Sequence, residues 1–220
     1  MEKSTENHRS NMDLRYERKY VLSLEDFPRL KSALLSSGYY KLYPDRVINN
    51  IYYDTQNLSN YEGNLEGFSR RFKVRVRWYD DLENNCTLEI KEKIDNLNRK
   101  KSFKFLRGQE DLTKQCPTLF PNEVHKELYA LGINISKFIP ILRNSYRREY
   151  YFNDKHGVRL TVDSCLKYQN LRTKRKASDN ISLVVEIKYR GDINFNEALD
   201  VLGLHLSKNS KYINGVDLTM

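Results

Sequence analysis

Apolar and charged residues alternate along most of the chain with the period of a β-strand. The longest such run covers residues 68–79. One face of its middle part carries only basic side chains: Arg71, Lys73, Arg75 and Arg77. Comparable runs predict further strands over residues 14–22, 46–54, 85–94, 99–107, 140–152, 158–169 and 183–190. The pattern predicts about eight strands in an antiparallel sheet with inserted helices, an α+β fold.

Helices are predicted where this alternation breaks off. Ser23 is a suitable N-cap for a helix over residues 24–37, and Gly38 follows that helix as a stop signal. Further helices are predicted over residues 57–65 and 194–203, with two more inside 109–137.

The remaining segments predict loops rather than boundaries between domains. Residues 170–180 are basic and polar and predict a loop, and residues 1–12 predict a disordered N-terminal tail. Since no linker divides the rest, residues 13–220 are expected to form a single domain.

The charge balance points to an anionic partner. The 220 residues include 38 Lys and Arg against 29 Asp and Glu, a net charge of +9. Such an excess favours a nucleic acid, a phosphate-rich ligand or an anionic membrane as partner, with a solvated basic surface as the alternative.

Cysteine and histidine usage excludes several kinds of site. The three cysteines, Cys86, Cys116 and Cys165, are far apart, and the four histidines lack the spacing of metal ligands. This argues against a disulfide framework or a zinc site and for a reducing compartment. The sequence shows no transmembrane run and no signal peptide, so we expect a cytoplasmic protein.

Charged residues recur on one face of several predicted strands. A Glu-x-Lys unit occurs three times: Glu17 with Lys19, Glu89 with Lys91, and Glu186 with Lys188. Any one of these strands fits an ordinary sheet with one solvated face. If instead the sheet closes with its apolar face outward, the charges line a bore. Crowded cations there would need a compensating anion, such as a triphosphate, and the carboxylates would suit Mg²⁺ or Mn²⁺.

Eight segments carry a resemblance to a known family. They are residues 15–22, 49–55, 72–79, 88–93, 145–151, 157–163, 184–190 and 207–212. In this order they resemble the triphosphate tunnel metalloenzymes of the CYTH superfamily, and within it the VTC domain, the polyphosphate polymerase domain of the vacuolar transporter chaperone family. The resemblance implies a closed eight-stranded antiparallel β-barrel with flanking helices. It also implies ATP-driven growth of a polyphosphate chain.

The resemblance also implies roles for individual residues. The catalytic set would be Lys19, Arg75, Arg77, Lys91, Arg148, Arg159 and Lys188. Further phosphate ligands would be Lys73, Lys208 and Lys211. The metal ligands would be Glu186 first, supported by Glu89 and Glu17. Arg147 remains an alternative to Arg148, and Lys208 and Lys211 are expected to face the same way on a short helix.

One departure from the family pattern bears on the reaction. The hydrolytic branch opens with Glu-x-Glu-x-Lys, whereas Arg15 occupies the first position here. This favours a polymerase over a triphosphatase or an adenylate cyclase. A metal-dependent triphosphatase and a non-catalytic polyanion-binding module remain the alternatives.

The expected partners are ATP and polyphosphate, and no nucleic acid. No RNP-type motif and no interleaved stacking surface accompany the basic strands. Any membrane association, and export of the product, would require a partner chain. The sequence singles out no aromatic residue for the nucleotide base.

Overall fold

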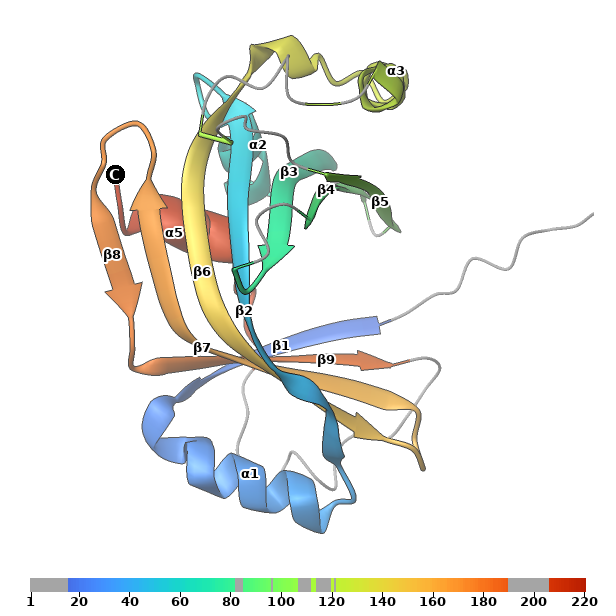
Figure 1. The fold of residues 1–220 in the computed structure, drawn as a ribbon, viewed down its shortest axis with the longest axis vertical. Coiled ribbons are helices and arrows are strands. Elements are labelled where there is room, and N and C mark those ends of the chain that lie inside the picture. The colour runs from blue at the N-terminus through green and yellow to red at the C-terminus, as the bar shows by residue number, and fades with distance from the viewer. Residues whose placement is uncertain are drawn as a thin grey trace, which may run out of the picture.

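A single antiparallel sheet dominates the computed structural model, which describes residues 16–81, 85–95, 97–106, 112–113, 120, 122–189 and 206–220. Its strands follow the order β1-β9-β7-β6-β2-β3-β4-β5, with β8 paired to β7 (Figure 1). The strands are β1 (Tyr16–Ser23), β2 (Tyr40–Thr55), β3 (Arg70–Tyr79), β4 (Asn85–Ile94), β5 (Leu97–Leu106), β6 (Phe138–Asn153), β7 (Val158–Asn170), β8 (Lys176–Asp179) and β9 (Ser182–Tyr189). The predicted α+β class with an antiparallel sheet is therefore confirmed.

Four α-helices accompany the sheet in the described residues. They are α1 (Phe27–Ser36), α2 (Ser59–Leu65), α3 (Asn122–Ala130) and α5 (Lys211–Asp217). A short 3₁₀ turn precedes α1, and the Ser23 hydroxyl accepts a hydrogen bond from Glu25 N–H, as the predicted cap requires. No helix in these parts of the chain is both long and apolar enough to cross a lipid bilayer.

Most predicted elements lie within a few residues of the observed ones, but the prediction of a loop over residues 170–180 was wrong. That segment contains β8, which pairs with β7 so that Asp179 lies opposite Leu166 and Lys176 lies opposite Gln169. The predicted helix 194–203, the tail 1–12 and part of the helical region 109–137 fall outside the described residues.

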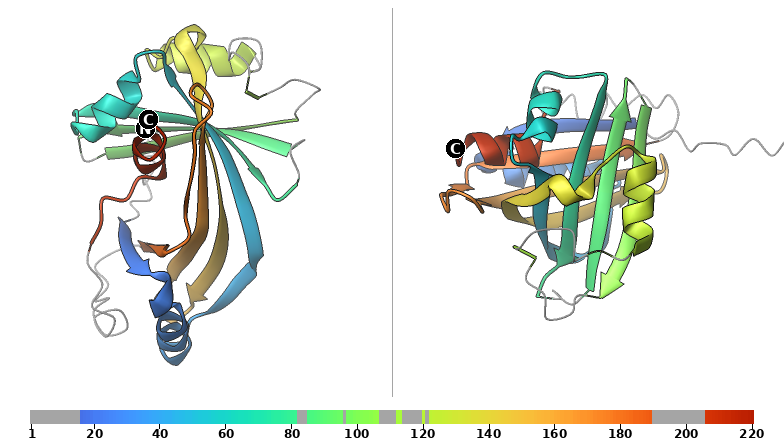
Figure 2. Two further views of the ribbon diagram at one scale, coloured as in Figure 1. Left: turned by 90° about the vertical axis from the view of Figure 1, so that its left-hand side faces the viewer. Right: turned by 90° about the horizontal axis from the view of Figure 1, so that it is seen from above.

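The expected closure of the sheet into a barrel was also wrong for the part of the chain that the structure describes. β1 and β5 stand at opposite ends of the strand order, and no described pairing joins them. The free edge of β1 is instead covered by the segment before α5. Tyr20 bridges Leu206, and Ser207 N–H donates to the Lys19 carbonyl at 2.8 Å. The sheet is bent into an open trough (Figures 1 and 2).

Apolar side chains on the convex face of the trough form two of the three core clusters. α1 inserts Leu30 and Leu34 against β7 and β9, where Leu160 and Ile187 are buried. α3 covers β3 and β4 in the same way, through Val124 and Leu128 against a set that includes Val76, Trp78 and Leu88. The helices therefore shield the outer face, and the charged side chains are left to the inner one.

α5 packs against the inner face, at one end of the trough (Figure 2). Tyr212 and Val216 are buried against Leu142, Tyr146 and Tyr168 of β6 and β7. The Tyr212 hydroxyl donates to Asp54 at 2.6 Å, which fixes the helix to the end of β2. These contacts hold the first residue of α5, Lys211, over the centre of the sheet.

The outer edge of β5 is the other end of the sheet. Its exposed side chains are predominantly basic: Arg99, Lys100, Lys101 and Lys104. Charged residues on an edge strand discourage pairing with the edge of another molecule.

Replacing Gly215 of α5 with alanine is expected to destabilise the fold. A methyl group there would lie 2.5 Å from both Leu142 Cδ2 and Tyr168 Cδ1. Overpacking of this kind costs about 1–3 kcal/mol, more than the roughly 1 kcal/mol that alanine gains over glycine in a helix. Thermal unfolding should show a lower midpoint for Gly215→Ala than for Asn214→Ala on the same helix. Equal midpoints would contradict the close packing of α5.

Candidate functional site

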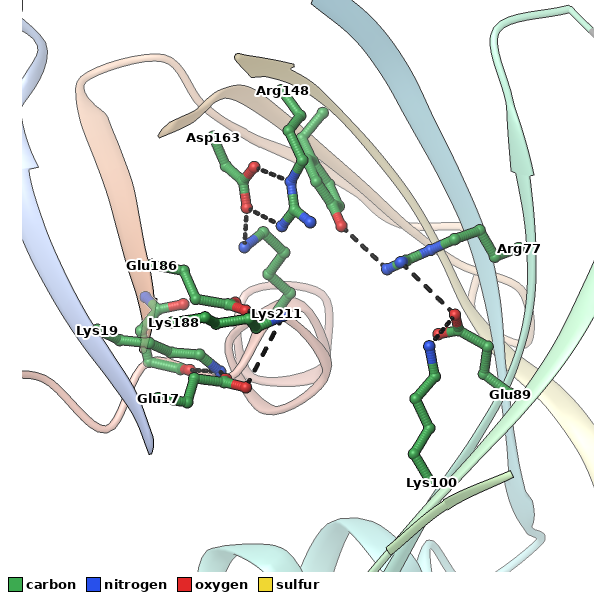
Figure 3. Close-up of polar contacts among 12 residues, drawn as sticks. Glu17, Lys19, Arg77, Glu89, Lys100, Arg148, Asp163, Glu186, Lys188 and Lys211 are labelled. Carbon is green, nitrogen blue, oxygen red and sulfur yellow. Dashed lines mark hydrogen bonds and ion pairs between the residues drawn. The ribbon is translucent and has the colours of Figure 1, made fainter. Parts of the chain in front are cut away.

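Charged side chains on the inner face gather from β1, β3, β4, β6, β7, β9 and α5 (Figure 3). We call this set the concave cluster. Its basic members are Lys19, Lys73, Arg75, Arg77, Lys91, Arg148, Lys188 and Lys211, and its acidic members are Glu17, Glu89, Asp163 and Glu186. The strand register brings them together, since Lys19 pairs with Glu186, Arg148 with Asp163, and Arg75 with Glu89.

The wall formed by β1 and β9 alternates lysine and glutamate. Lys188 Nζ lies 2.6 Å from Glu186 Oε1 and 4.0 Å from Glu17 Oε2, and Lys19 Nζ lies 3.0 Å from Glu17 Oε1. Burial alone would raise the pKa of Glu186, but Lys188, Lys19 and Arg148 hold it well below its usual range. Both carboxyl groups therefore stay ionised near neutral pH, which makes them available as metal ligands.

The middle of the cluster is organised by Asp163, whose side chain has 0% exposure. It accepts two hydrogen bonds from Arg148, at 2.6 and 2.7 Å, and lies 2.6 Å from Lys211 Nζ. Burial by itself would raise the pKa of Asp163, yet these two cations lower it. One buried carboxylate thus fixes an arginine from β6 and a lysine from α5 side by side.

The opposite wall, from β3 and β4, is built around Glu89. Arg75 Nε donates to Glu89 at 2.8 Å, and Lys100 Nζ of β5 lies 2.7 Å from the same carboxyl group. Arg77 Nη1 lies 3.8 Å away, and its Nε donates to Asn50 at 2.9 Å. The Arg75 and Arg77 side chains are only 14% and 9% exposed, so they lie within the trough and not on a solvated face.

Lys73 and Lys91 carry the unbalanced charge of the site. They are direct partners in the register of β3 and β4, so two ammonium groups share one pair position. Burial, with Lys19 and Lys91 nearby, lowers the pKa of Lys73 to about 7, and burial together with Arg75 lowers that of Lys91 to about 8. Opposing like charges are unfavourable, and a bound polyanion would relieve this.

The carboxylates suggest where a divalent cation would bind. In the described residues no group of three or more His, Cys, Asp or Glu side chains is arranged to hold a metal ion. Glu17 and Glu186 are nevertheless diagonal neighbours on β1 and β9, since Glu17 pairs with Lys188 and Glu186 with Lys19, and both influence Lys91. Mg²⁺ is commonly bound by one or two carboxylates, substrate phosphates and waters, so this pair fits such a site. Glu89 lies on the other wall, beside Arg77 and Lys100 (Figure 3), and also pairs with Arg75.

The remaining predicted site residues lie at the margins. Arg159 is exposed opposite Lys188 in the register. Lys208 is exposed in the segment before α5, and the helix begins only at Lys211. The prediction that Lys208 and Lys211 share one helical face was therefore wrong, because Ser210 caps α5 between them. Arg148 joins the concave cluster, whereas Arg147 pairs with Asp45 at 2.7 Å.

Several polar residues of the site were missed from the sequence. Asp163 lies on the same alternating face as Arg159, and that signal could have found it. The Thr161 hydroxyl and Asn209 Oδ1 are buried without a hydrogen-bond partner in the described residues. Thr161 is the register partner of Glu186, and the Asn209 carbonyl accepts from Lys19 at 3.5 Å. These atoms could contact a ligand in the trough.

Solved structures share this architecture at low sequence identity. A candidate adenylate cyclase from Bacillus halodurans matches with a TM-score of 0.61 and 20% identity, over 92% of this chain and 96% of that one. HpAC1 from Hippeastrum, a candidate adenylyl cyclase described as having a dominant triphosphatase activity, matches with a TM-score of 0.55 and 16% identity, over 94% and 97%. A search of curated proteins found no match.

A bent antiparallel sheet with a charged inner face thus defines the class of fold. The chain belongs to the VTC domain family, which matches residues 14–220. The resemblance stated from the sequence motifs is confirmed.

Replacing Lys73 with methionine should stabilise the protein in a pH-dependent way. Because the pKa of Lys73 falls to about 7 on folding, the unfolded chain binds more protons between pH 7 and the ordinary lysine value of about 10.4. Protonated Lys73 therefore destabilises the folded protein to its full extent below pH 7, and this destabilisation disappears as the pH rises through that window. The midpoint of thermal unfolding of Lys73→Met should therefore exceed that of wild type most at pH 6 and hardly at all near pH 10.

The matched control is Lys176→Met, at an exposed position of β8. The pH-dependent gain in stability should be larger for Lys73→Met than for this control. A difference from wild type that stays constant with pH for Lys73→Met would contradict the partly buried, cation-crowded environment of Lys73.

Proposed function

We propose that the protein is a metal-dependent phosphotransferase that passes the terminal phosphoryl group of ATP to a growing polyphosphate chain. The observation that carries this proposal is the excess of basic over acidic side chains in the concave cluster, where Lys73 also stands opposite Lys91. A triphosphate would offset this charge along its whole length. Membership of the VTC domain family supports the same substrate chemistry.

Phosphoryl transfer depends mainly on positioning and charge neutralisation. Arg148 and Lys211, held together by Asp163, would bind oxygens of one phosphate, and Arg75 and Arg77 would bind oxygens of the next from the other wall. Guanidinium groups can bind phosphate through two parallel hydrogen bonds. An acceptor phosphate is already an anion at neutral pH, so the transfer needs no general base from the protein.

Glu186 and Glu17 would hold Mg²⁺ or Mn²⁺, and a bound ion would neutralise charge on the donor's phosphate oxygens. Lys188 and Lys19 compensate the two carboxylates, and in the proposed complex they would turn toward phosphate oxygens. Both lysines would then add to the binding of the donor.

A triphosphatase, with water as the acceptor, is the second candidate, and the description of HpAC1 favours it. Arg15 favours the polymerase, since it replaces a carboxylate of the hydrolase motif. This residue lies outside the described part of the chain. A cation at this position would help to hold a polyanionic acceptor.

The reaction type can be tested directly with purified protein. Incubation with ATP and Mn²⁺ or Mg²⁺ is expected to give a ladder of long polyphosphate on a gel, together with ADP. Release of orthophosphate and ADP without any polymer would replace the polymerase with the triphosphatase. Tight binding of triphosphate without turnover would leave a polyanion-binding module.

The metal assignment predicts the effect of Glu186→Gln. Removing this charge should lower kcat by at least about 100-fold, the usual size of losing one electrostatic catalytic contact. Glu149→Gln is the matched control, because Glu149 is also buried in a strand but pairs with Lys31 and Lys41 on the outer face. Turnover in Glu186→Gln equal to that in Glu149→Gln, with Mn²⁺ still bound, would remove Glu186 from the metal site.

A further inference from the structure

Aromatic side chains gather on the inner face at the end of the trough where β6 ends and β2 begins. We call this group the aromatic platform. It consists of Tyr40, Tyr43, Tyr79, Tyr150 and Phe152, together with Arg46. The register places it on the inner face, because Tyr43 pairs with Tyr150, Arg46 pairs with Arg148, and Arg148 belongs to the concave cluster.

The rings of the platform contact one another in pairs. Tyr43 meets Tyr150 edge to face, with centroids 5.8 Å apart, and Tyr40 meets Phe152 in the same way at 6.1 Å. The Arg46 guanidinium lies 6.0 Å from the Tyr43 ring and 5.7 Å from the Tyr79 ring. The surface is therefore ordered by its own contacts before any ligand arrives.

The platform begins where the concave cluster ends. Tyr150 follows Arg148 by two positions on β6, which corresponds to about 7 Å along a strand. Phe152 pairs with Arg159, and Arg159 pairs with Lys188 of the cluster. That spacing is close to the distance between a nucleobase and its α-phosphate, so one nucleotide can span from ring to cation.

The platform is open enough to receive a flat ligand. Tyr43 is 50% exposed and Tyr40 is 42% exposed. Tyr129 of α3 is more exposed, at 83%, but it lies on a helix that covers the outer face. Aromatic faces beside an arginine suit a nucleobase, because stacking and cation–π attraction act on any planar ring of this kind.

We propose that the aromatic platform stacks the base of the nucleoside triphosphate donor while the concave cluster holds its phosphates, an inference that rests on the proposed function. Tyr43 and Arg46 are the principal contacts, and Tyr150 supports Tyr43 from the neighbouring strand. Because stacking reads no hydrogen-bonding edge of the base, the site accepts any nucleotide and binds purines more tightly than pyrimidines.

The test compares ligands with and without a base. Calorimetric titration would measure the binding of the β,γ-imido analogue of ATP and of inorganic triphosphate, both with Mg²⁺, to wild type, Tyr43→Ala and Tyr43→Trp. Tyr43→Ala should weaken binding of the ATP analogue about tenfold, the effect of losing one base stack, and leave inorganic triphosphate within about twofold. Tyr43→Trp should bind both ligands like wild type. Tyr129→Ala is the control for removing an exposed tyrosine.

A second measurement needs no variant. The triphosphate of 2-aminopurine riboside loses fluorescence when its base stacks, so binding to wild type should quench it. Binding of this ligand without quenching would overturn the proposal. So would a Tyr43→Ala variant that loses affinity equally for the ATP analogue and inorganic triphosphate, or loses affinity for neither. A concentration-dependent dimer that Tyr43→Ala abolishes, with unchanged nucleotide affinity, would make the platform an interface between copies.

These outcomes separate the platform from the proposed function. Wild-type protein that binds inorganic triphosphate tightly, with no selective effect of Tyr43→Ala, would refute the platform and leave the phosphotransferase intact. Wild-type protein that binds neither ligand would refute both.

Discussion

The arrangement of the inner face depends on one buried carboxylate between two cations. Asp163 has no contact with water, so its charge is tolerable only because Arg148 and Lys211 neutralise it. This requirement ties α5 to β6 and β7, and the packing of Gly215 against Leu142 and Tyr168 makes that approach possible. The same contact holds two cations close together, and the proposed function assigns a phosphate to them.

Under the proposed function, the trough would divide the recognition of a nucleotide between two kinds of chemistry. Its centre is crowded with cations, and its end presents aromatic rings and Arg46. The first attracts any polyphosphate, and the second can favour a ligand with a base. A donor would be held by both, whereas a polyphosphate product would be held only by the first. Such a difference would allow the two ligands to exchange within one continuous site.

Much of this arrangement could be predicted from the sequence, because strand alternation determines which side chains share a face. The alternation in β3 predicted that Arg75 and Arg77 lie together, and the caps around α1 predicted its bounds closely. The prediction of a closed barrel failed because the pattern within strands carries no information on which edges pair. In the structure, the segment before α5 covers the edge of β1. The partnership of Asp163 with Lys211 joins residues distant in sequence, so no local period could reveal it.

The basic edge of β5 has a consequence for the behaviour of the protein in concentrated polyphosphate. Lys100 and Lys101 are compensated by Glu89 and Glu127, but repulsion between the exposed Arg99 and Lys104 on separate molecules opposes the joining of their open edges. A long polyanion that coats these residues would cancel that repulsion and bring several molecules onto one strand of polymer. The colloidal stability of the protein would then depend on the ratio of polymer to protein. Turbidity should be greatest where the two charges balance and should disappear when the polymer is in excess.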